Sequence, residues 1–230
     1  MYEQTLDFSA VWAAFDQLLA GAGLTLLLTV QAAVLGMAIA IAGAWGRTNG
    51  PGWVRRAVGV YVEVIRNTPF LVQIFFIYFG LPAVGISFNP NPAALLALTI
   101  NVGAYGTEII RAGIQSIHWG QVEAGIALGL KRVQIFRFII LKPALRTVYP
   151  ALTSQFIFLM LTSSVVSVIS ANDLAAAGND VNSETFASFE TYIVVTAMYL
   201  VMSSMLAAFF AAVQRVAFRY PLGRCREVAE

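Results

Sequence analysis

The chain has 230 residues, of which 59% are hydrophobic and 11% charged, and its formal net charge is +2. Soluble domains are about 45–50% apolar and about 25% charged, so this composition indicates an integral membrane protein. The small net charge does not favour nucleic acid as a partner. The single cysteine, Cys225, excludes a disulfide framework within one chain and a cysteine-only metal site, and the single histidine, His118, argues against a haem or multi-histidine metal centre.

Five segments are apolar enough to be membrane helices, which need roughly 20 mostly apolar residues. In chain order they are about 18–45, 69–84, 93–110, 151–169 and 191–213. The segment before the first of them is acidic, so it does not resemble a cleaved signal peptide. We therefore expect an all-α integral membrane protein with five transmembrane helices.

Basic residues are found in alternate connections between these segments. The connections with Lys or Arg are the first (Arg47, Arg55, Arg56), the third (Arg111, Lys131, Arg132, Arg137, Lys142, Arg146) and the C-terminal tail (Arg215, Arg219, Arg224, Arg226). The N-terminal tail has only acidic charges (Glu3, Asp7, Asp16), as does the fourth connection (Asp173, Asp180, Glu184, Glu190), and the second has none. Because Lys and Arg mark the cytoplasmic side, we predict an external N-terminus and a cytoplasmic C-terminus.

The segment before the second span, about 53–66, is predicted to be a helix on the inner membrane surface. Pro69 suits the first position of the next helix, with Asn67 or Thr68 as its cap, so we expect a break at these residues. Glu63 and Arg66 lie one helical turn apart near the inner surface. They form either a simple surface ion pair or part of a gate.

The third connection, about 119–143, is an amphipathic, basic segment. We predict one helix from Trp119 that ends at Gly129, since glycine is the usual residue just past a helix end. A second short helix, about 133–141, is expected to stop before Pro143. Spacing alone leaves two interpretations open, which are a hairpin on the lipid surface held by its basic residues and a docking element for a soluble partner.

This connection resembles the EAA loop of ABC importer permeases, whose pattern is E-A-A-x3-G-x9-I-x-L-P. The match is E123-A124-G125-x3-G129-x9-I139-x-L141. Three other stretches, "IRNTPFLVQIFFIYFGLP", "EIIRAGIQSIHWGQ" and "SSVVSVISANDL", resemble the polar amino acid uptake subfamily of these permeases, and the matches cover about residues 25–213. The chain departs from the pattern at Gly125, which replaces the second Ala, and at Lys142, which places Pro143 one position late.

The resemblance implies the type I ABC importer permease fold over a single transmembrane domain, residues 1–230, in a bacterial inner membrane. The EAA loop would be a helix-turn-helix that couples this chain to a separate ATPase, through residues Glu123, Ala124, Gly125, Leu128 and Gly129. The partners implied are a second permease subunit, identical or a sister chain, two cytoplasmic ATP-binding subunits and an extracytoplasmic amino acid-binding protein. ATP and Mg would bind the ATPase, and no cofactor is expected in this chain, which has no Walker A motif.

Polar side chains within the spans are candidates for the transport pathway, because ionisable groups inside a bilayer are expensive and usually functional. Glu108 can pair with Arg111 one turn later, so it is either a structural ion pair or a gating or substrate group. A hydroxyl cluster ends the fourth span, and these side chains either bond their own backbone or line a polar path: Thr162, Ser163, Ser164 and Ser167. Gln73 is a similar candidate in the second span.

The alternative function is a self-contained secondary transporter or channel. That class predicts coupling-ion carboxylates at mid-bilayer and internal repeats. Glu108 is the only carboxylate close to that description, and the sequence has no evident repeat. We therefore favour the transmembrane subunit of an ATP-driven amino acid importer, which is not itself an enzyme.

Overall fold

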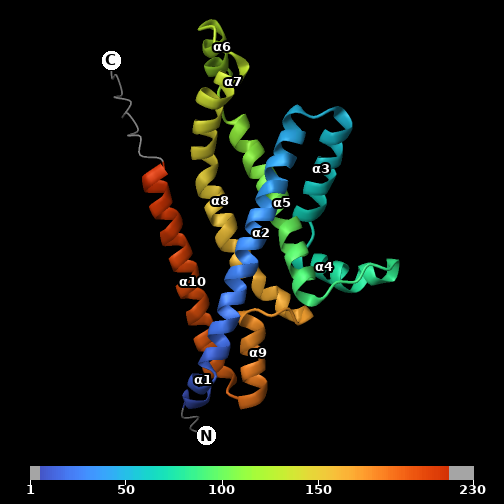
Figure 1. Ribbon diagram of the computed structural model, residues 1–230, viewed down its shortest axis with the longest axis vertical. Helices are drawn as coiled ribbons and strands as arrows, with labels where there is room; N and C mark the ends of the chain where they lie inside the picture. The colour runs from blue at the N-terminus through green and yellow to red at the C-terminus, as the bar shows by residue number, and fades with distance from the viewer. Residues whose placement is uncertain (1–5, 218–230) are drawn as a thin grey trace.

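The computed structural model describes residues 6–217, and these residues form helices without a β-strand. Four helices are long and apolar enough to cross a membrane (Figure 1): α2 (Phe15–Asn49), α5 (Pro90–Gln115), α8 (Lys142–Thr162) with the 3-10 turn η4 (Ser163–Ile169), and α10 (Ser188–Ala217). Each covers one predicted span and is longer than expected, because the helical backbone continues beyond the apolar stretch. The C-terminal residues Arg219, Arg224, Cys225 and Arg226 lie outside the described residues.

Small side chains bring α2 and α5 close together at the centre of the bundle. A Cβ atom on Gly36 would lie 2.7 Å from Val102, and a Cβ on Gly106 would lie 2.7 Å from Ala40. Membrane helices associate through such small residues, because the lipid supplies no hydrophobic force between them and close contact must do so. The α2–α5 interface therefore forms the scaffold on which α3 and α8 pack.

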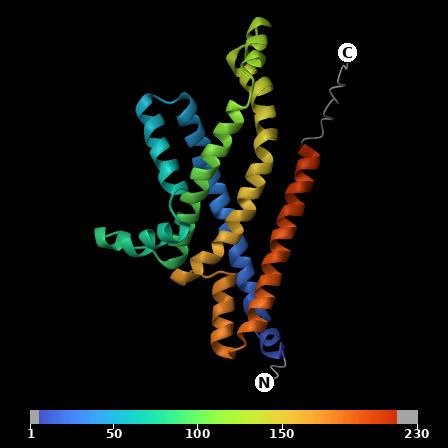
Figure 2. The ribbon, with the colours of Figure 1, turned by 180° about the vertical axis from the view of Figure 1, so that it is seen from behind.

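The predicted second span is bent instead of straight. Helix α3 (Gly52–Arg66) and the helical segment from Phe70 to Val84 meet at 108°. Figures 1 and 2 show α3 beside α2 and α5, whereas the next segment leaves the bundle sideways. That segment consists of α4 (Phe70–Phe75), the π-helix η1 (Phe76–Gly80) and the 3-10 turn η2 (Leu81–Val84).

The predicted break is confirmed, but the roles of its two sides are reversed. Residues 52–66, expected on the membrane surface, lie along the bundle, and residues 69–84 do not form a separate straight span. Asn67 and Thr68 do not cap α4. Their side chains donate hydrogen bonds to the carbonyl oxygens of Glu63 and Val64, each at 2.8 Å, and so satisfy the end of α3.

The loop predicted as two helices has three helical parts: α6 (Trp119–Ala127), α7 (Arg132–Gln134) and the π-helix η3 (Ile135–Leu141). The predicted stop before Pro143 is wrong, since the helix continues through this proline into α8. A proline has no N–H and its ring crowds the preceding turn, and the wider π-helical turn before it accommodates both effects.

The two ends of the bundle differ in charge. In Figure 1 the α6–α7 loop and the α2–α3 connection lie at one end, and α1 (Ser9–Ala13) and α9 (Leu174–Thr185) lie at the other. The first end includes the basic connections, and the second includes the acidic ones. This separation agrees with the predicted orientation.

At the acidic end, a buried carboxyl group joins α9 to α10, and the backbone next to it joins α9 to α2. Asp173 is 1% exposed, and its Oδ1 accepts a hydrogen bond from the Ala176 N–H at 2.8 Å, which caps α9. The Tyr199 hydroxyl of α10 donates to Asp173 Oδ2 at 3.2 Å, and the Leu174 N–H donates to Thr25 Oγ1 of α2 at 2.9 Å. Burial raises the pKa of Asp173 above its usual value, while the backbone and Tyr199 hydrogen bonds lower it.

We expect Asp173→Ala to destabilise the protein by about 1–2 kcal/mol, because it removes a helix cap and leaves buried donors unpaired. Asp173→Asn retains a capping oxygen without a buried charge, so at neutral pH it should be at least as stable as the wild type. Thermal unfolding of the detergent-purified protein measures both.

The same carboxyl group should make stability depend on pH. The pKa of Asp173 is higher in the folded than in the unfolded protein. Its contribution to the free energy of unfolding is therefore complete below the unfolded pKa of about 3.9, and it is lost as pH rises through the folded pKa. Asp173→Asn should abolish this dependence. Equal destabilisation by Asn and Ala would contradict the assigned capping role.

Candidate functional site

Residues 119–141, here called the two-helix knob, form one end of the molecule (Figure 1). The His118 Nδ1 accepts a hydrogen bond from the Gly120 N–H at 3.1 Å and so caps α6. The helix ends at Gly129, whose φ of 72° is left-handed, as predicted. The Leu130 N–H bonds to the Gly125 carbonyl at 3.1 Å and the Gly129 N–H to Ile126 at 2.9 Å, which is the Schellman geometry of a helix end.

Gly125 lies between the two halves of the knob. It is buried, and a Cβ atom there would lie 2.5 Å from Ile139 Cδ1 and 3.2 Å from Ile135. The close approach that glycine allows at this position is therefore made within the knob itself. The flexible end of Ile139 would have to move and Ile135 would have to shift slightly to accommodate the alanine of the EAA pattern.

The other predicted coupling residues, Glu123, Ala124, Leu128 and Gly129, are exposed. Glu123 accepts a hydrogen bond from Trp119 Nε1 at 2.8 Å, one turn earlier, so it braces the first turns of α6. Leu128 is 79% exposed, and large apolar side chains nearby are also exposed: Trp119, Ile126 and Val133. The knob thus presents an apolar surface on a rigid two-helix frame.

Gln73 is a structural clip across the α3–α4 break. Its Nε2 donates to the Ile65 carbonyl at 2.7 Å and lies 2.9 Å from Thr68 Oγ1 and 3.0 Å from the Thr68 carbonyl. Its Oε1 accepts from Asn101 Nδ2 of α5 at 3.2 Å. This amide therefore connects α3, α4 and α5, and its polar atoms are occupied by protein.

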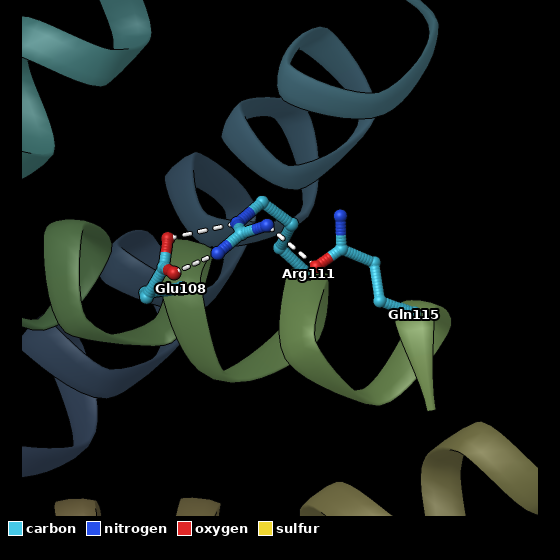
Figure 3. A network of polar contacts seen from close by, with 3 residues as sticks. All are labelled: Glu108, Arg111 and Gln115. Atoms are coloured by element: carbon cyan, nitrogen blue, oxygen red, sulfur yellow. Dashed lines mark hydrogen bonds and ion pairs between the residues drawn. The ribbon is translucent and has the colours of Figure 1, made fainter. Parts of the chain in front are cut away.

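Glu108 and Arg111 form a two-pronged ion pair on α5 (Figure 3), and it is the only salt bridge among the side chains that the structure describes. Arg111 Nε donates to Glu108 Oε2 at 3.0 Å and Arg111 Nη2 to Glu108 Oε1, while Nη1 donates to Gln115 at 2.6 Å. The two side chains are 22–23% exposed. The local pair that their spacing allows is therefore present, which leaves the choice between a structural and a gating or substrate role to experiment.

Arg66 and Glu63 do not form the second predicted pair. The guanidinium of Arg66 lies over the ring of Tyr105, 5.4 Å from its centroid, and so contacts α5 instead of its own helix. A positive charge over an aromatic face is attracted by the electrons of the ring. Tyr61 makes a parallel link from α3 to α5, since its hydroxyl donates to the Ile100 carbonyl at 2.7 Å.

The hydroxyl cluster near the end of the fourth span bonds to its own backbone. Ser163, Ser164 and Ser167 donate to the carbonyls of Met160, Leu161 and Ser164 at 2.7–2.8 Å. These bonds accompany the change from α8 to the 3-10 turn η4. Thr162 is half-buried in the last turn of α8.

Four polar groups that the sequence did not single out lie in the described span helices without a partner. They are Thr99 Oγ1 of α5, Thr153 Oγ1 and Gln155 Nε2 of α8, and Thr191 Oγ1 of α10, which are buried and make no hydrogen bond. Unpaired polar atoms in a span are costly, so each is a candidate contact for a polar solute. Hydropathy alone gives no signal for them, because pairing depends on the packing of the helices.

Residues 32–219 match the family of binding-protein-dependent transport system inner membrane components. The glutamine transport system permease protein GlnP of Escherichia coli K12 is 37% identical over 212 residues, which are 91% of this chain and 96% of GlnP. The octopine permease protein OccM of Rhizobium radiobacter is 32% identical over 217 residues, 90% of this chain and 89% of OccM. The L-cystine permease protein TcyB of Bacillus subtilis is 33% identical over 197 residues, 85% of this chain and 84% of TcyB.

Solved structures agree with these sequence matches. A chain of an amino acid ABC transporter crystallised with histidines superimposes with a TM-score of 0.86 and 34% identity, over 92% of this chain and 99% of that one. A chain of the methionine ABC transporter MetNI, with 22% identity and a TM-score of 0.66 over 86% of this chain and 96% of that one, has the same fold. The chain described here therefore belongs to the binding-protein-dependent transport system inner membrane components, the permease subunits of ABC importers.

Proposed function

We propose that this subunit carries polar amino acids into the cell by alternating access and that a separate ATPase drives it through the two-helix knob. The relatives at 32–37% identity are permeases for glutamine, octopine and cystine, all of which are polar amino acids or their derivatives. The amino acid itself is not specified by these relatives, because they differ among themselves.

The exposed knob is the observation that carries the proposal. Leu128, at the centre of its apolar surface, is 79% exposed. A knob without a partner would favour polar side chains at such positions. Its second half continues into α8 without a break. A rigid-body movement of a docked ATPase would therefore pass directly into a membrane helix.

The complete transporter would contain two permease subunits, two ATP-binding subunits that hold ATP and Mg, and an extracytoplasmic binding protein. The chain would be one transmembrane domain, residues 1–230, in the inner membrane of a bacterium, with the knob in the cytoplasm and α9 on the outer side. This orientation follows from the basic and acidic ends of the bundle.

The path for the solute would use the unpaired polar groups Thr99, Thr153 and Gln155 in preference to the candidates from sequence. Gln73, Ser163, Ser164 and Ser167 hold irregular backbone in place, and Glu108 is neutralised by Arg111. These residues would shape the pathway by fixing its walls.

Substitutions at Gly129 should distinguish coupling to the ATPase from insertion of the subunit into the membrane. Gly129→Val places a branched side chain at a φ of 72° and should nearly abolish uptake, at a strain of about 1–3 kcal/mol, while the protein stays in the membrane. Gly129→Asn should retain most of the uptake, because asparagine tolerates this conformation. No side chain lies within 4 Å of the added Cβ, so crowding is not a cause.

Uptake is measured in the reconstituted complex with whichever of radiolabelled glutamine, octopine and cystine the wild type transports, together with co-purification of the ATPase. The proposed coupling role predicts that Val reduces both and Asn neither. Normal uptake with Gly129→Val would show that this turn does not couple the subunits.

A double-mutant cycle should separate a structural from a solute-contacting role of Glu108. Arg111→Gln leaves the carboxylate unpaired in a poorly hydrated site, so we expect a loss of about 1–3 kcal/mol in assembly. Glu108→Gln with Arg111→Gln should restore assembly and most of the uptake, because no charge is left unpaired.

Arg55→Gln is the matched control. Arg55 is exposed, and its substitution removes the same positive charge at the same end of the bundle. It should leave assembly and uptake near the wild-type values. A double variant that assembles fully and binds the ATPase but transports nothing would assign Glu108 to the solute path or the gate.

A further inference from the structure

A groove of about 950 Å³ opens between the first half of α2 and the facing side of α10, with α1 at one end. All of its lining side chains are apolar. Trp12 of α1 and Phe15 at the start of α2 lie at one end, and Leu26 and Met205 lie farther along α2 and α10. In Figures 1 and 2, α10 lies at the edge of the bundle, and most of its side chains are exposed, so the groove lies on the outer surface of the subunit.

The length of the groove corresponds to one lipid leaflet. Phe15 and Leu26, the first and last lining residues on α2, are eleven residues apart, which is about 17 Å at the helical rise of about 1.5 Å per residue. The hydrocarbon core of a bilayer is about 30 Å thick, so the groove spans about half of it. Trp12, 60% exposed, stands at its outer end, where aromatic residues mark the membrane interface.

The walls of the groove suit a flexible chain. Gly23 lines the groove, and no atom outside its own turn lies within 4 Å of a Cβ built there, so space is open at this position. Ala197 faces the groove from α10, together with the unbranched side chains of Met198, Met202 and Met205. Methionine adapts its shape to irregular apolar surfaces.

The outer end of the groove is negatively charged. The Asp7 N–H donates to Glu190 Oε1 at 3.3 Å, so these two residues lie next to each other beside Phe8, which lines the groove. Hydrogen bonds from Ser9 hold the pKa of Asp7 below its usual value. The sequence has no Lys or Arg in residues 1–46 or 147–214, so no basic side chain from α2, α9 or α10 lies at this end to neutralise the two carboxylates.

We propose that this groove binds one acyl chain of a phosphatidylethanolamine molecule in the outer leaflet, with its ammonium group beside Asp7 and Glu190. The apolar walls match the acyl chain, and the acidic end attracts a primary ammonium and repels lipids that carry only negative charge. A second permease subunit fits less well. Both copies would keep the same side outward, so a contact through this groove would bring two acidic ends to the same level.

The test uses the whole permease–ATPase complex, reconstituted in vesicles of equal parts phosphatidylethanolamine and phosphatidylglycerol and then extracted for native mass spectrometry. The wild-type complex should retain phosphatidylethanolamine in preference to phosphatidylglycerol. Gly23→Leu fills the groove and should lower the retained lipid about tenfold. Ala20→Leu adds the same side chain at an exposed position of α2 outside the groove and should change nothing.

The charge is tested by Asp7→Asn with Glu190→Gln, which should retain a lipid but lose the preference for phosphatidylethanolamine. Asp180→Asn with Glu184→Gln is the control for this double variant. Both residues are exposed on α9, and their substitution removes the same amount of negative charge. Ala197→Leu fills the groove from the facing helix and replaces Gly23→Leu if that variant does not assemble.

Three results would overturn the proposal. They are equal retention of lipid by Gly23→Leu and Ala20→Leu, equal binding of both lipids by the wild type, and separation of the permease pair by Gly23→Leu without loss of lipid. The last result would make the groove a contact between permease subunits. ATPase binding is recorded for every variant, so loss of the complex is distinguished from loss of the lipid.

Discussion

The close packing of α2 against α5 is the contact on which the other elements depend. Gly36 and Gly106 let the two helices approach, and α3, α4 and α8 then attach to α5. Gly113 of α5 receives Val148 of α8 in the same way. The two-helix knob follows α5 after a short turn and continues directly into α8, so the packing of α5 against α8 in the membrane sets its position.

The polar side chains of the spans mostly serve the backbone. Gln73 occupies carbonyl groups left free at the α3–α4 break, and Ser163 and Ser167 do the same where α8 tightens into a 3-10 turn. The bilayer core has no water to hydrogen-bond with irregular backbone. Each departure from an α-helix therefore needs a nearby side chain that makes the hydrogen bond instead. A polar residue in a span therefore marks a local change of helix geometry as readily as a solute site.

Four of the five predicted spans, the break at Asn67–Thr68 and the helix end at Gly129 agree with the structure, because each rests on local chemistry that a single segment contains. The sequence did not predict that α3 lies along the bundle while the next segment turns away by 108°, since hydropathy measures how apolar a segment is and not its direction. The helix through Pro143 was missed because a π-helical turn leaves no clear sequence pattern. Of the pathway candidates, pairing of Glu108 was predictable from its spacing to Arg111, whereas the clip formed by Gln73 depends on a contact with Asn101 from another helix.

The helix that begins at Arg132 runs without interruption to Thr162, a length of about 45 Å, and residues 130–177 contain no glycine. It is therefore a stiff strut, and a tilt of about 10° at the knob would displace its far end by about 8 Å. Bending would concentrate at Pro150, where one backbone hydrogen bond is missing. The neighbouring Tyr149 donates its hydroxyl hydrogen to the Phe210 carbonyl of α10 at 2.8 Å. A movement of the knob would therefore be transmitted along α8 and, through this hydrogen bond, to α10. The two helices would then move together as one rigid unit.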